Sequence, residues 1–233
     1  MSSKLVIALD TDIKKAKKIV NIAKNFEFEL FKIGHLLFDT NPEIIDYITS
    51  QNLKVILDLK FHDIPSVISK AIIKILEKYK IFAFTIHTLG GEKFLKEVKK
   101  VITDFPESPI IFAVTILTSL EDKDLKKLGF KNNVKSTVIN LAKLAKKCGI
   151  DGVVCSPKEV KSIKQTCGKN FLTLVPGVSL GNLNHAPDQQ RTSSIKAVVS
   201  SEADYIVVGR SIYEAENIES TLQYLYNLTN KQV

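Results

Sequence analysis

Three charged residues lie within the short segment 58–63, which reads DLKFHD, and a fourth, Lys32, lies in an earlier apolar run. Asp58 and Lys60 are two positions apart, so on a strand their side chains point to the same side. With Asp63 and Lys32 they would form an array of alternating charge, in which carboxylates keep each ammonium protonated and repel any anion between them. Such an array suits a reaction that expels negative charge and then protonates carbon. The alternative is a structural salt bridge, although burying several charges without a task is costly.

A second set of residues could hold an anionic group. Gly209-Arg210 follows a late apolar run and precedes a helical pattern. Glycine lets backbone N–H groups approach a phosphate, and a guanidinium can bind two of its oxygens. Pro176-Gly177 supplies a turn after the preceding apolar run, and Gln189 could close over the phosphate. Because many barrels bind phosphate after strands seven and eight, we predict a phosphate site here.

These residues need a scaffold that brings distant parts of the chain together. Short apolar runs alternate with lysine-rich amphipathic segments, which indicates a parallel sheet covered by helices. The expected strands are Leu5–Leu9, Leu30–Ile33, Val55–Leu59, Ala83–His87, Ile110–Thr115, Gly152–Cys155, Leu172–Val175 and Tyr205–Val208. The expected helices span 12–25, 42–50, 66–79, 91–102, 136–148, 157–166, 192–201 and 211–228. Eight such units in 233 residues predict an α/β fold, a (β/α)8 TIM barrel, with one domain over residues 1–233.

Barrel enzymes carry their catalytic groups at the C-terminal ends of the strands. Polar residues end most of the expected strands: Asp10, Lys32, Asp58, Lys60, His87, 115–119 and Gly209-Arg210. The longest irregular stretch, 176–190, follows strand seven, where an active-site lid would lie. A second stretch, 118–135, has room for an extra short helix. We expect His62 to lie behind the site or at an interface, and His87 to shape the rim rather than titrate.

The net charge of +8, from 33 basic and 25 acidic residues, favours an anionic partner. Most lysines fall at helical spacing, as in 14–18 and 143–147, which is typical of solvated helix faces. A nucleic-acid-binding protein would need basic residues clustered on one face with stacking aromatics. The lysines are dispersed and tryptophan is absent, so we expect a phosphorylated small molecule and no nucleic acid.

The cysteines and the N-terminus indicate the compartment. Cys148, Cys155 and Cys167 show neither disulfide nor zinc spacing, which favours a reducing cytosol. Residues 1–10 lack the apolar region and cleavage site of a signal peptide. No apolar run approaches the roughly 20 residues of a membrane span. We therefore expect a cytoplasmic protein without a membrane partner. We also expect no metal site, because Lys60 already neutralises the acidic pair of Asp58 and Asp63.

The run D-L-K-F-H-D-I-P at residues 58–65 resembles the signature of the orotidine 5′-phosphate decarboxylase family. The resemblance extends over essentially the whole chain, in order. Further matching stretches are Ile7–Asp10, Phe31–Gly34, Val114–Ser119, Pro176-Gly177, Asp188–Arg191 and Val207–Arg210. The resemblance implies cofactor-free decarboxylation of orotidine 5′-phosphate to uridine 5′-phosphate, the last step of de novo UMP synthesis.

The resemblance also implies roles for single residues. Lys60 would protonate C6 as carbon dioxide leaves, with Asp58 beside the substrate carboxylate. Asp63 would reach into the site of a neighbouring subunit, so that the working unit is a homodimer. Substrate contacts would come from Asp10 and Lys32 to the ribose hydroxyls, Thr118 to the pyrimidine, Gln189, Gly209 and Arg210 to the phosphate, and from Ile64 and Pro176.

Two departures and one rival accompany the resemblance. Ser179 stands where the family commonly has an arginine that contacts substrate, and Ser66-Val67 replace a usual Asn-Thr pair. The rival is a magnesium-dependent 3-hexulose-6-phosphate synthase or keto-gulonate-phosphate decarboxylase on the same barrel. Those enzymes share the D-x-K-x-x-D spacing but carry a glutamate at the position of Lys32. Lys32-Ile33-Gly34 therefore favours the orotidylate enzyme.

Overall fold

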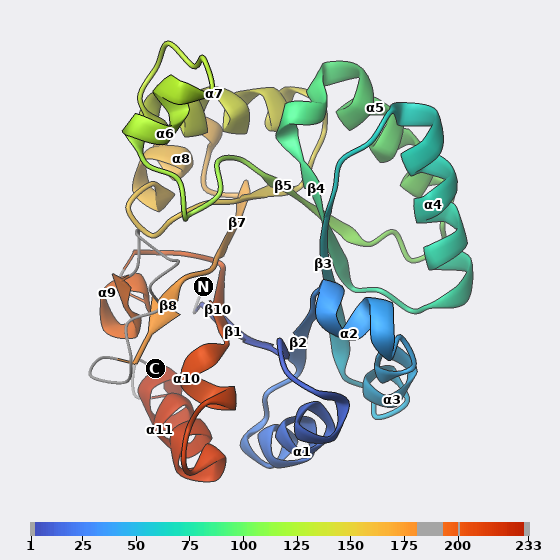
Figure 1. Cartoon of the computed structure of the whole chain (residues 1–233), viewed down its shortest axis with the longest axis vertical. Helices are drawn as coiled ribbons and strands as arrows, with labels where there is room; N and C mark the ends of the chain where they lie inside the picture. Colours follow the sequence, from blue (N-terminus) through green and yellow to red (C-terminus); the bar gives the residue numbers. More distant parts are fainter. Residues whose placement is uncertain (1–2, 181–192, 200, 231–233) are drawn as a thin grey trace.

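Eight parallel strands close into a barrel, and helices surround it (Figure 1). The computed structural model describes residues 3–180, 193–199 and 201–230. Around the barrel the strands follow the order β1-β10-β7-β6-β5-β4-β3-β2, and β2 pairs again with β1. The predicted (β/α)8 barrel is confirmed. Among the described helices, none is long and apolar enough to cross a membrane.

The barrel strands follow the predicted apolar runs closely. They are β1 (Lys4–Ala8), β2 (Leu30–Ile33), β3 (Lys54–Phe61), β4 (Ala83–His87), β5 (Ile110–Val114), β6 (Gly152–Val154), β7 (Leu172–Val175) and β10 (Tyr205–Val208). The helices are α1 (Ile13–Ala23), α2 (His35–Thr40), α3 (Ile44–Thr49), α4 (Pro65–Lys78), α5 (Gly91–Thr103), α6 (Asp122–Lys127), α7 (Val134–Lys147), α8 (Val160–Cys167), α9 (Ile195–Val199), α10 (Arg210–Tyr213) and α11 (Ile218–Asn230). Two short 3-10 turns are η1 (Lys24–Phe26) and η2 (Thr88–Gly90).

Alternating residues of each strand pack into two different layers. On β1, Val6 and Ala8 belong to a cluster that fills the barrel interior, whereas Leu5 and Ile7 pack in the larger cluster between strands and helices. The interior cluster also contains alternate residues of other strands, among them Leu30, Ile56, Phe112, Leu174 and Val207. Both faces of the strands are therefore largely buried, which explains why the strands are mostly apolar.

The structure differs from the predicted elements in three places. The expected helix 211–228 is divided into α10 and α11, because Asn217 accepts a hydrogen bond from the backbone N–H of Ser220 and begins a new helix. Helix α2 was not predicted, since its six residues are too short to show a periodic pattern. Strand β8 (Val178–Ser179), in the expected irregular stretch, pairs with β9 (Ser193–Ser194), which occupies the start of the expected helix 192–201. Helix α6 lies in the second irregular stretch, as expected.

Candidate active site

The alternation along the strands also places the charged side chains inside the mouth of the barrel. On β2, Lys32 lies two positions after the interior residue Leu30, and on β3 Asp58 lies two positions after Ile56. Asp10 follows Ala8 of β1 in the same way. Because residues two apart on a strand share a face, the three charged side chains continue the interior layer at its C-terminal end.

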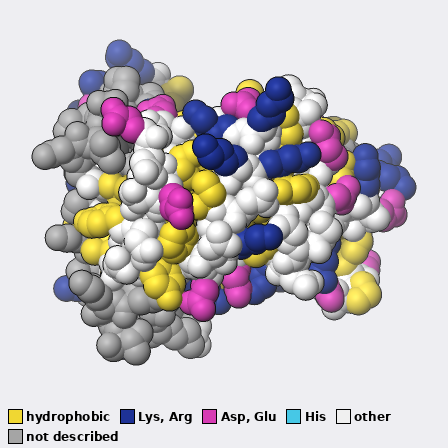
Figure 2. Space-filling view, turned by 90° about the horizontal axis from the view of Figure 1, so that it is seen from below, with side chains coloured by type: hydrophobic (Ala, Val, Ile, Leu, Met, Phe, Trp, Pro, Cys, Tyr) yellow, Lys and Arg dark blue, Asp and Glu magenta, His cyan; other side chains and the backbone are white. Residues whose placement is uncertain are grey.

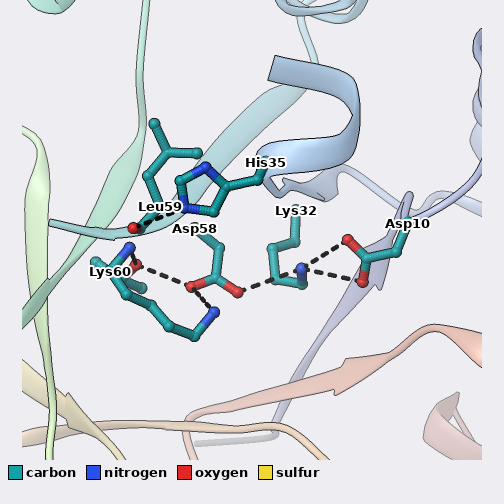
Figure 3. Close-up of polar contacts among 7 residues, drawn as sticks. Asp10, Lys32, His35, Asp58, Leu59 and Lys60 are labelled. Carbon is teal, nitrogen blue, oxygen red and sulfur yellow. Dashed lines mark hydrogen bonds and ion pairs between the residues drawn. The ribbon is translucent and has the colours of Figure 1, made fainter. Parts of the chain in front are cut away.

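These side chains form a row of alternating charge (Figure 3). Lys32 Nζ lies 3.2 Å from Asp10 Oδ1 and 3.3 Å from Asp58 Oδ2. Lys60 Nζ lies 3.0 Å from Asp58 Oδ1, the other oxygen of the same carboxylate. Asp10, Lys32, Asp58 and Lys60 are therefore linked in that order, and each inner member contacts two opposite charges. Of the four residues predicted to form the array, Lys32, Asp58 and Lys60 are part of this row. Its fourth member is Asp10, which was not expected there, and Asp63 is not part of it.

Burial and neighbouring charge act in opposite directions on the two inner members. Burial alone would lower the pKa of Lys32, but the charges of Asp58 and Asp10 outweigh it and raise that pKa. Burial alone would raise the pKa of Asp58, but Lys32 and Lys60 lower it to about 2. Both groups are thus held in their charged forms near neutral pH. A buried carboxylate kept ionised in this way can repel an anionic substrate group placed against it.

The backbone of β3 is irregular at the site. Leu57 pairs with Phe84 and Phe61 with Ile86, so three residues of β3 lie opposite a single residue of β4. Within this bulge Lys60 has φ 48°, in the left-handed region that residues with a side chain rarely adopt. Bulges next to active sites re-aim side chains, and this one directs Lys60 toward Asp58. A regular strand, which the sequence predicts, is therefore not what brings the pair together.

A cavity of about 250 Å³ opens at this end of the barrel. Its described lining comprises Ala8, Asp10, Lys32, Asp58, Lys60, Val114, Ile116, Leu117, Thr118, Val154, Leu174, Pro176, Gly177, Val178, Ser179, Val207, Gly209, Arg210, Ser211 and Tyr213. The charged row forms one wall, and Gly209-Arg210 another part of the lining. The volume suits a small molecule, and Arg210 in the lining suits one with an anionic group.

Most of the predicted site residues meet in this cavity, two do not, and one lies outside the described part of the chain. Thr118, Pro176, Gly209 and Arg210 line it together with the charged row. Asp63 and Ile64 are exposed and are not part of this lining; Asp63 Oδ1 instead accepts a hydrogen bond from the N–H of Ile64. Gln189 lies outside the described residues.

The part of the cavity at the turn between β10 and α10 contains a residue without a side chain, Gly209. A Cβ on Gly209 would lie 3.2 Å from Cβ of Ala8 and 3.4 Å from Cε1 of Tyr213. Gly209 therefore lets the turn between β10 and α10 approach β1 closely. Arg210, the first residue of α10, lines the cavity from this turn. A guanidinium beside a backbone turn is an arrangement that binds phosphate oxygens.

Two histidines pack behind Lys60. The rings of His62 and His87 are stacked, with centroids 5.1 Å apart. Burial, together with the nearby charges of His62 and Lys60, lowers the pKa of His87 to about 4. His87 is therefore neutral near pH 7, in agreement with the prediction that it shapes the rim rather than titrates there.

Two residues at the site were not predicted. Thr85 on β4 is fully buried, and its hydroxyl donates to Asp58 Oδ1 at 2.8 Å. Its place two positions after the interior residue Ala83 was a usable signal, because a polar side chain on that face must point toward the mouth. Tyr213 lines the cavity, and burial followed by the charge of Asp10 raises its pKa. Its place in the first turn after Gly209-Arg210 is the only sequence signal for it.

Within residues 3–180, 193–199 and 201–230, no three His, Cys, Asp or Glu side chains are grouped so as to hold a metal ion. On the face seen in Figure 2, Lys and Arg side chains are interspersed with acidic and hydrophobic ones. This face does not carry the continuous basic patch typical of nucleic-acid binding.

Comparison with known proteins places this chain in a family. The family model described as "Orotidine 5'-phosphate decarboxylase / HUMPS family" matches residues 3–224. The chain belongs to this family. The orotidine 5'-phosphate decarboxylase of Legionella pneumophila (strain Lens) is 37% identical over 220 residues, which cover 93% of this chain and 95% of the relative. That of Carboxydothermus hydrogenoformans is 38% identical over 224 residues, covering 93% and 92%.

A solved structure of the family has the same barrel. The crystal structure of orotidine 5'-phosphate decarboxylase from Lactobacillus acidophilus superposes with a TM-score of 0.83 at 31% identity, and covers 98% of this chain and 99% of that one. The family description joins two names, so family membership alone does not specify the reaction of this chain.

Proposed function

We propose that this protein decarboxylates orotidine 5′-phosphate to uridine 5′-phosphate, the last step of de novo UMP synthesis. The bond between C6 and the carboxylate breaks, and its electron pair stays on C6. Lys60 Nζ then donates a proton to C6 and is reprotonated from solvent, so that substrate and one proton become uridine 5′-phosphate and carbon dioxide. The observation that carries the proposal is the Asp10–Lys32–Asp58–Lys60 array inside the cavity.

The array supplies charge where this reaction needs it. Asp58 is ionised near pH 7 because its pKa is about 2, so it repels a substrate carboxylate held beside it. That repulsion ends when carbon dioxide leaves, whereas Lys60 is most strongly attracted to the charge that develops on C6. Groups that are fixed before the reaction stabilise such a charge without reorganising.

The other end of the cavity supports binding of the phosphate. Arg210 and the turn at Gly209 would bind the phosphate, Thr118 the pyrimidine, and Asp10 and Lys32 the ribose hydroxyls. Pro176 lies in the lining and Ile64 at the rim, and we propose that both contact the substrate, with Gln189 at the phosphate. Binding energy from the phosphate can then hold the carboxylate against Asp58, although the two groups repel each other.

We further propose that the working unit is a homodimer whose sites are shared. Asp63 is exposed and outside the cavity lining of its own chain. Around it, the ends of β2, β3 and β4 carry exposed apolar side chains: Leu36, Ile64, Val67 and Leu89. Apolar groups gathered at one rim are typical of a surface that another protein covers. A second copy bound there would bring its Asp63 toward the array.

The alternative function is that of a magnesium-dependent barrel enzyme, a 3-hexulose-6-phosphate synthase or keto-gulonate-phosphate decarboxylase. The position of Lys32 argues against it. Its ammonium lies within 3.3 Å of oxygens of both Asp10 and Asp58, so it occupies the place that a cation would take between these carboxylates. A magnesium ion would have to bind beside that charge.

The three free, buried cysteines support the cytoplasm as the location.

The test is a substrate and metal assay on the purified protein. Incubated with orotidine 5′-phosphate in excess EDTA, it should form uridine 5′-phosphate and carbon dioxide in equal amounts, with loss of the orotidylate absorbance. Added magnesium should not change the rate. If there is no turnover, or if turnover requires magnesium, the proposal is wrong, and the second result would favour the alternative function.

A further inference from the structure

Thr85 is the single residue of β4 that lies opposite the bulge of β3. The three bulged residues are Asp58, Leu59 and Lys60, between the paired positions Leu57 and Phe61. The Thr85 side chain is fully buried. It lies two residues after Ala83, whose side chain packs in the barrel interior, so it is on the same face of β4 and nearer the mouth of the barrel. It is not part of the cavity lining, so it has no direct access to a bound molecule.

The hydroxyl of Thr85 makes two hydrogen bonds, and both go to the charged pair. It donates to Asp58 Oδ1 at 2.8 Å and accepts from the backbone N–H of Lys60 at 2.9 Å. Asp58 Oδ1 is also the oxygen that Lys60 Nζ contacts at 3.0 Å. The backbone of Lys60, the Thr85 hydroxyl, the Asp58 carboxylate and the Lys60 ammonium therefore form a closed ring of contacts.

The peptide that enters Lys60 is held on its other side as well. His35 Nε2 lies 3.2 Å from the carbonyl oxygen of Leu59, as Figure 3 shows. A carbonyl only accepts, so the tautomer with hydrogen on Nε2 makes this bond. In a regular sheet, both groups of this peptide would pair with neighbouring backbones. Here the side chains of His35 on α2 and Thr85 on β4 make these bonds instead, so the backbone need not follow the regular strand.

We propose that Thr85 is a positioning residue for the decarboxylation, an inference that rests on the function proposed above. Its hydroxyl is hydrogen-bonded both to the backbone N–H of Lys60 and to the carboxylate of Asp58. These two bonds fix the position of the Lys60 ammonium, the proton donor, relative to the Asp58 carboxylate. Without the hydroxyl, Lys60 can relax toward an ordinary strand conformation, because φ 48° is unfavourable for a lysine. Its ammonium would then move away from Asp58. Displacement of a reacting group by about 1 Å can lower a rate on the order of 100-fold.

Three variants test this proposal with turnover measured first. Thr85→Val keeps the shape and removes the hydroxyl; we expect kcat to fall on the order of 100-fold while KM changes far less. Thr85→Ser restores the hydroxyl and should recover most of kcat. The matched control is Thr88→Val, since the Thr88 hydroxyl is equally buried but donates to the carbonyl of Val114, away from the array. Its kcat should remain that of the wild type. Thr85→Ala replaces Thr85→Val if the latter does not fold.

A second measurement does not depend on turnover. In the wild type, the backbone N–H of Lys60 donates a hydrogen bond to the Thr85 hydroxyl. NMR should therefore show that the exchange of this amide hydrogen with solvent rises roughly 10-fold in Thr85→Val. Its exchange should not rise in Thr85→Ser or Thr88→Val. If the wild type does not decarboxylate orotidine 5′-phosphate but Lys60 exchange responds in this way, the proposed function fails and the positioning by Thr85 stands. If Thr85→Val matches Thr88→Val in kcat and in Lys60 exchange, the positioning role is overturned.

Discussion

Lys60 adopts a backbone conformation that lysine rarely occupies, and it does so where its side chain meets Asp58. Strained conformations persist only where the surrounding structure over-determines them, and they cluster at functional sites. Here the surrounding contacts are the Thr85 hydroxyl on the amide side and His35 on the carbonyl side. The strain therefore supports the assignment of a positioned reactive group rather than an ordinary surface lysine.

The ionisation of Asp58 gives a prediction about stability and pH. Its pKa in the folded protein is about 2, below the usual 3.8, so it stabilises the fold above pH 3.8 and loses that contribution as the pH falls through 2. We expect the free energy of unfolding of the wild type to fall between pH 4 and pH 2 by about 2 kcal/mol more than that of Asp58→Asn. Urea unfolding at several pH values measures both. Equal pH dependence in the two proteins would show that Lys32 and Lys60 do not hold Asp58 ionised.

Gly34 gives a second prediction at this scale. Its φ of −100° suits any residue, yet a Cβ there would lie 3.0 Å from Asp10 Oδ1. Gly34→Ala should therefore displace the Asp10 carboxylate from Lys32 and raise KM for orotidine 5′-phosphate, since Asp10 is a proposed ribose contact. Gly129→Ala is the control: its φ is +84° and nothing lies within 4 Å, so it should cost stability but leave KM unchanged. An unchanged KM for Gly34→Ala would argue against that role of Asp10.

The third prediction at the residue scale concerns Arg210 and the binding of the phosphate. Because a charge-assisted hydrogen bond to phosphate is worth about 1.5–3 kcal/mol, Arg210→Ala should raise KM roughly 10- to 100-fold. Steady-state kinetics on orotidine 5′-phosphate and on orotidine, which lacks the phosphate, measure the effect. The variant should lose much less with orotidine. An equal loss with both substrates would place the phosphate elsewhere.

At the scale of elements, the strands were the most predictable feature of the chain. Each barrel strand is buried on both faces, and a continuous apolar run bounded by polar residues is the direct sequence record of that burial. The bulge in β3 left no such record. Asp58 and Lys60 would share a face on a regular strand too, so their spacing predicted the correct neighbours for an incorrect geometrical reason.

The short elements were less predictable for a related reason. Helices α2 and α10 have six and four residues, and neither can display the periodicity by which a helix is recognised. Thr85 was missed because a lone threonine in a strand is common, and its importance depends on the neighbouring strand that it contacts. Tyr213 likewise gains its place only when α10 closes against β1.

The opposite end of the barrel provides a prediction about stability alone. Lys164 Nζ is buried and donates to Asp204 Oδ2 at 2.6 Å, and the same oxygen accepts from the backbone N–H and hydroxyl of Thr173 on β7. Asp204→Ala would remove the negative charge beside Lys164, whose ammonium would keep only the carbonyls of Lys169 and Phe171, and would remove the acceptor of the Thr173 N–H. The variant should be destabilised by about 3 kcal/mol, and kcat of the folded variant should be unchanged.

The control for Asp204 is Glu77, whose pair with Lys74 is exposed. Removing such a pair changes stability by less than about 1 kcal/mol. Thermal or urea unfolding of Asp204→Ala and Glu77→Ala compares the two directly. If both variants unfolded alike, the buried pair would not be what closes β7 against β10.

At the scale of the whole molecule, the rim near Asp63 is the feature that a single chain does not explain. It combines an acidic residue with exposed apolar neighbours at the ends of three adjacent strands. A monomer rarely keeps such side chains uncovered without a use. In a two-fold dimer, each copy would cover the apolar rim of the other and extend Asp63 toward the other cavity.

Hybrid dimers test this arrangement. Lys60→Ala and Asp63→Ala should each be nearly inactive alone. In a mixed dimer, one site combines the intact Lys60 of one chain with the intact Asp63 of the other. After full subunit exchange of an equal mixture, about a quarter of the sites should therefore be intact, with a corresponding recovery of activity. If subunit exchange is demonstrated and no activity returns, the site is not shared.

The central claim, that Lys60 acts as proton donor within a metal-free array, is tested most directly by the kcat of Lys60→Ala in EDTA, compared with the wild type. Calorimetry of uridine 5′-phosphate binding shows whether the variant still holds the ligand. We expect rapid turnover by the wild type in EDTA and retained uridine 5′-phosphate binding by Lys60→Ala. The kcat of Lys60→Ala should be lower than that of the wild type by at least about 100-fold, the minimum expected from loss of a positioned general acid. A variant that binds uridine 5′-phosphate and turns over substrate as fast as the wild type would contradict it.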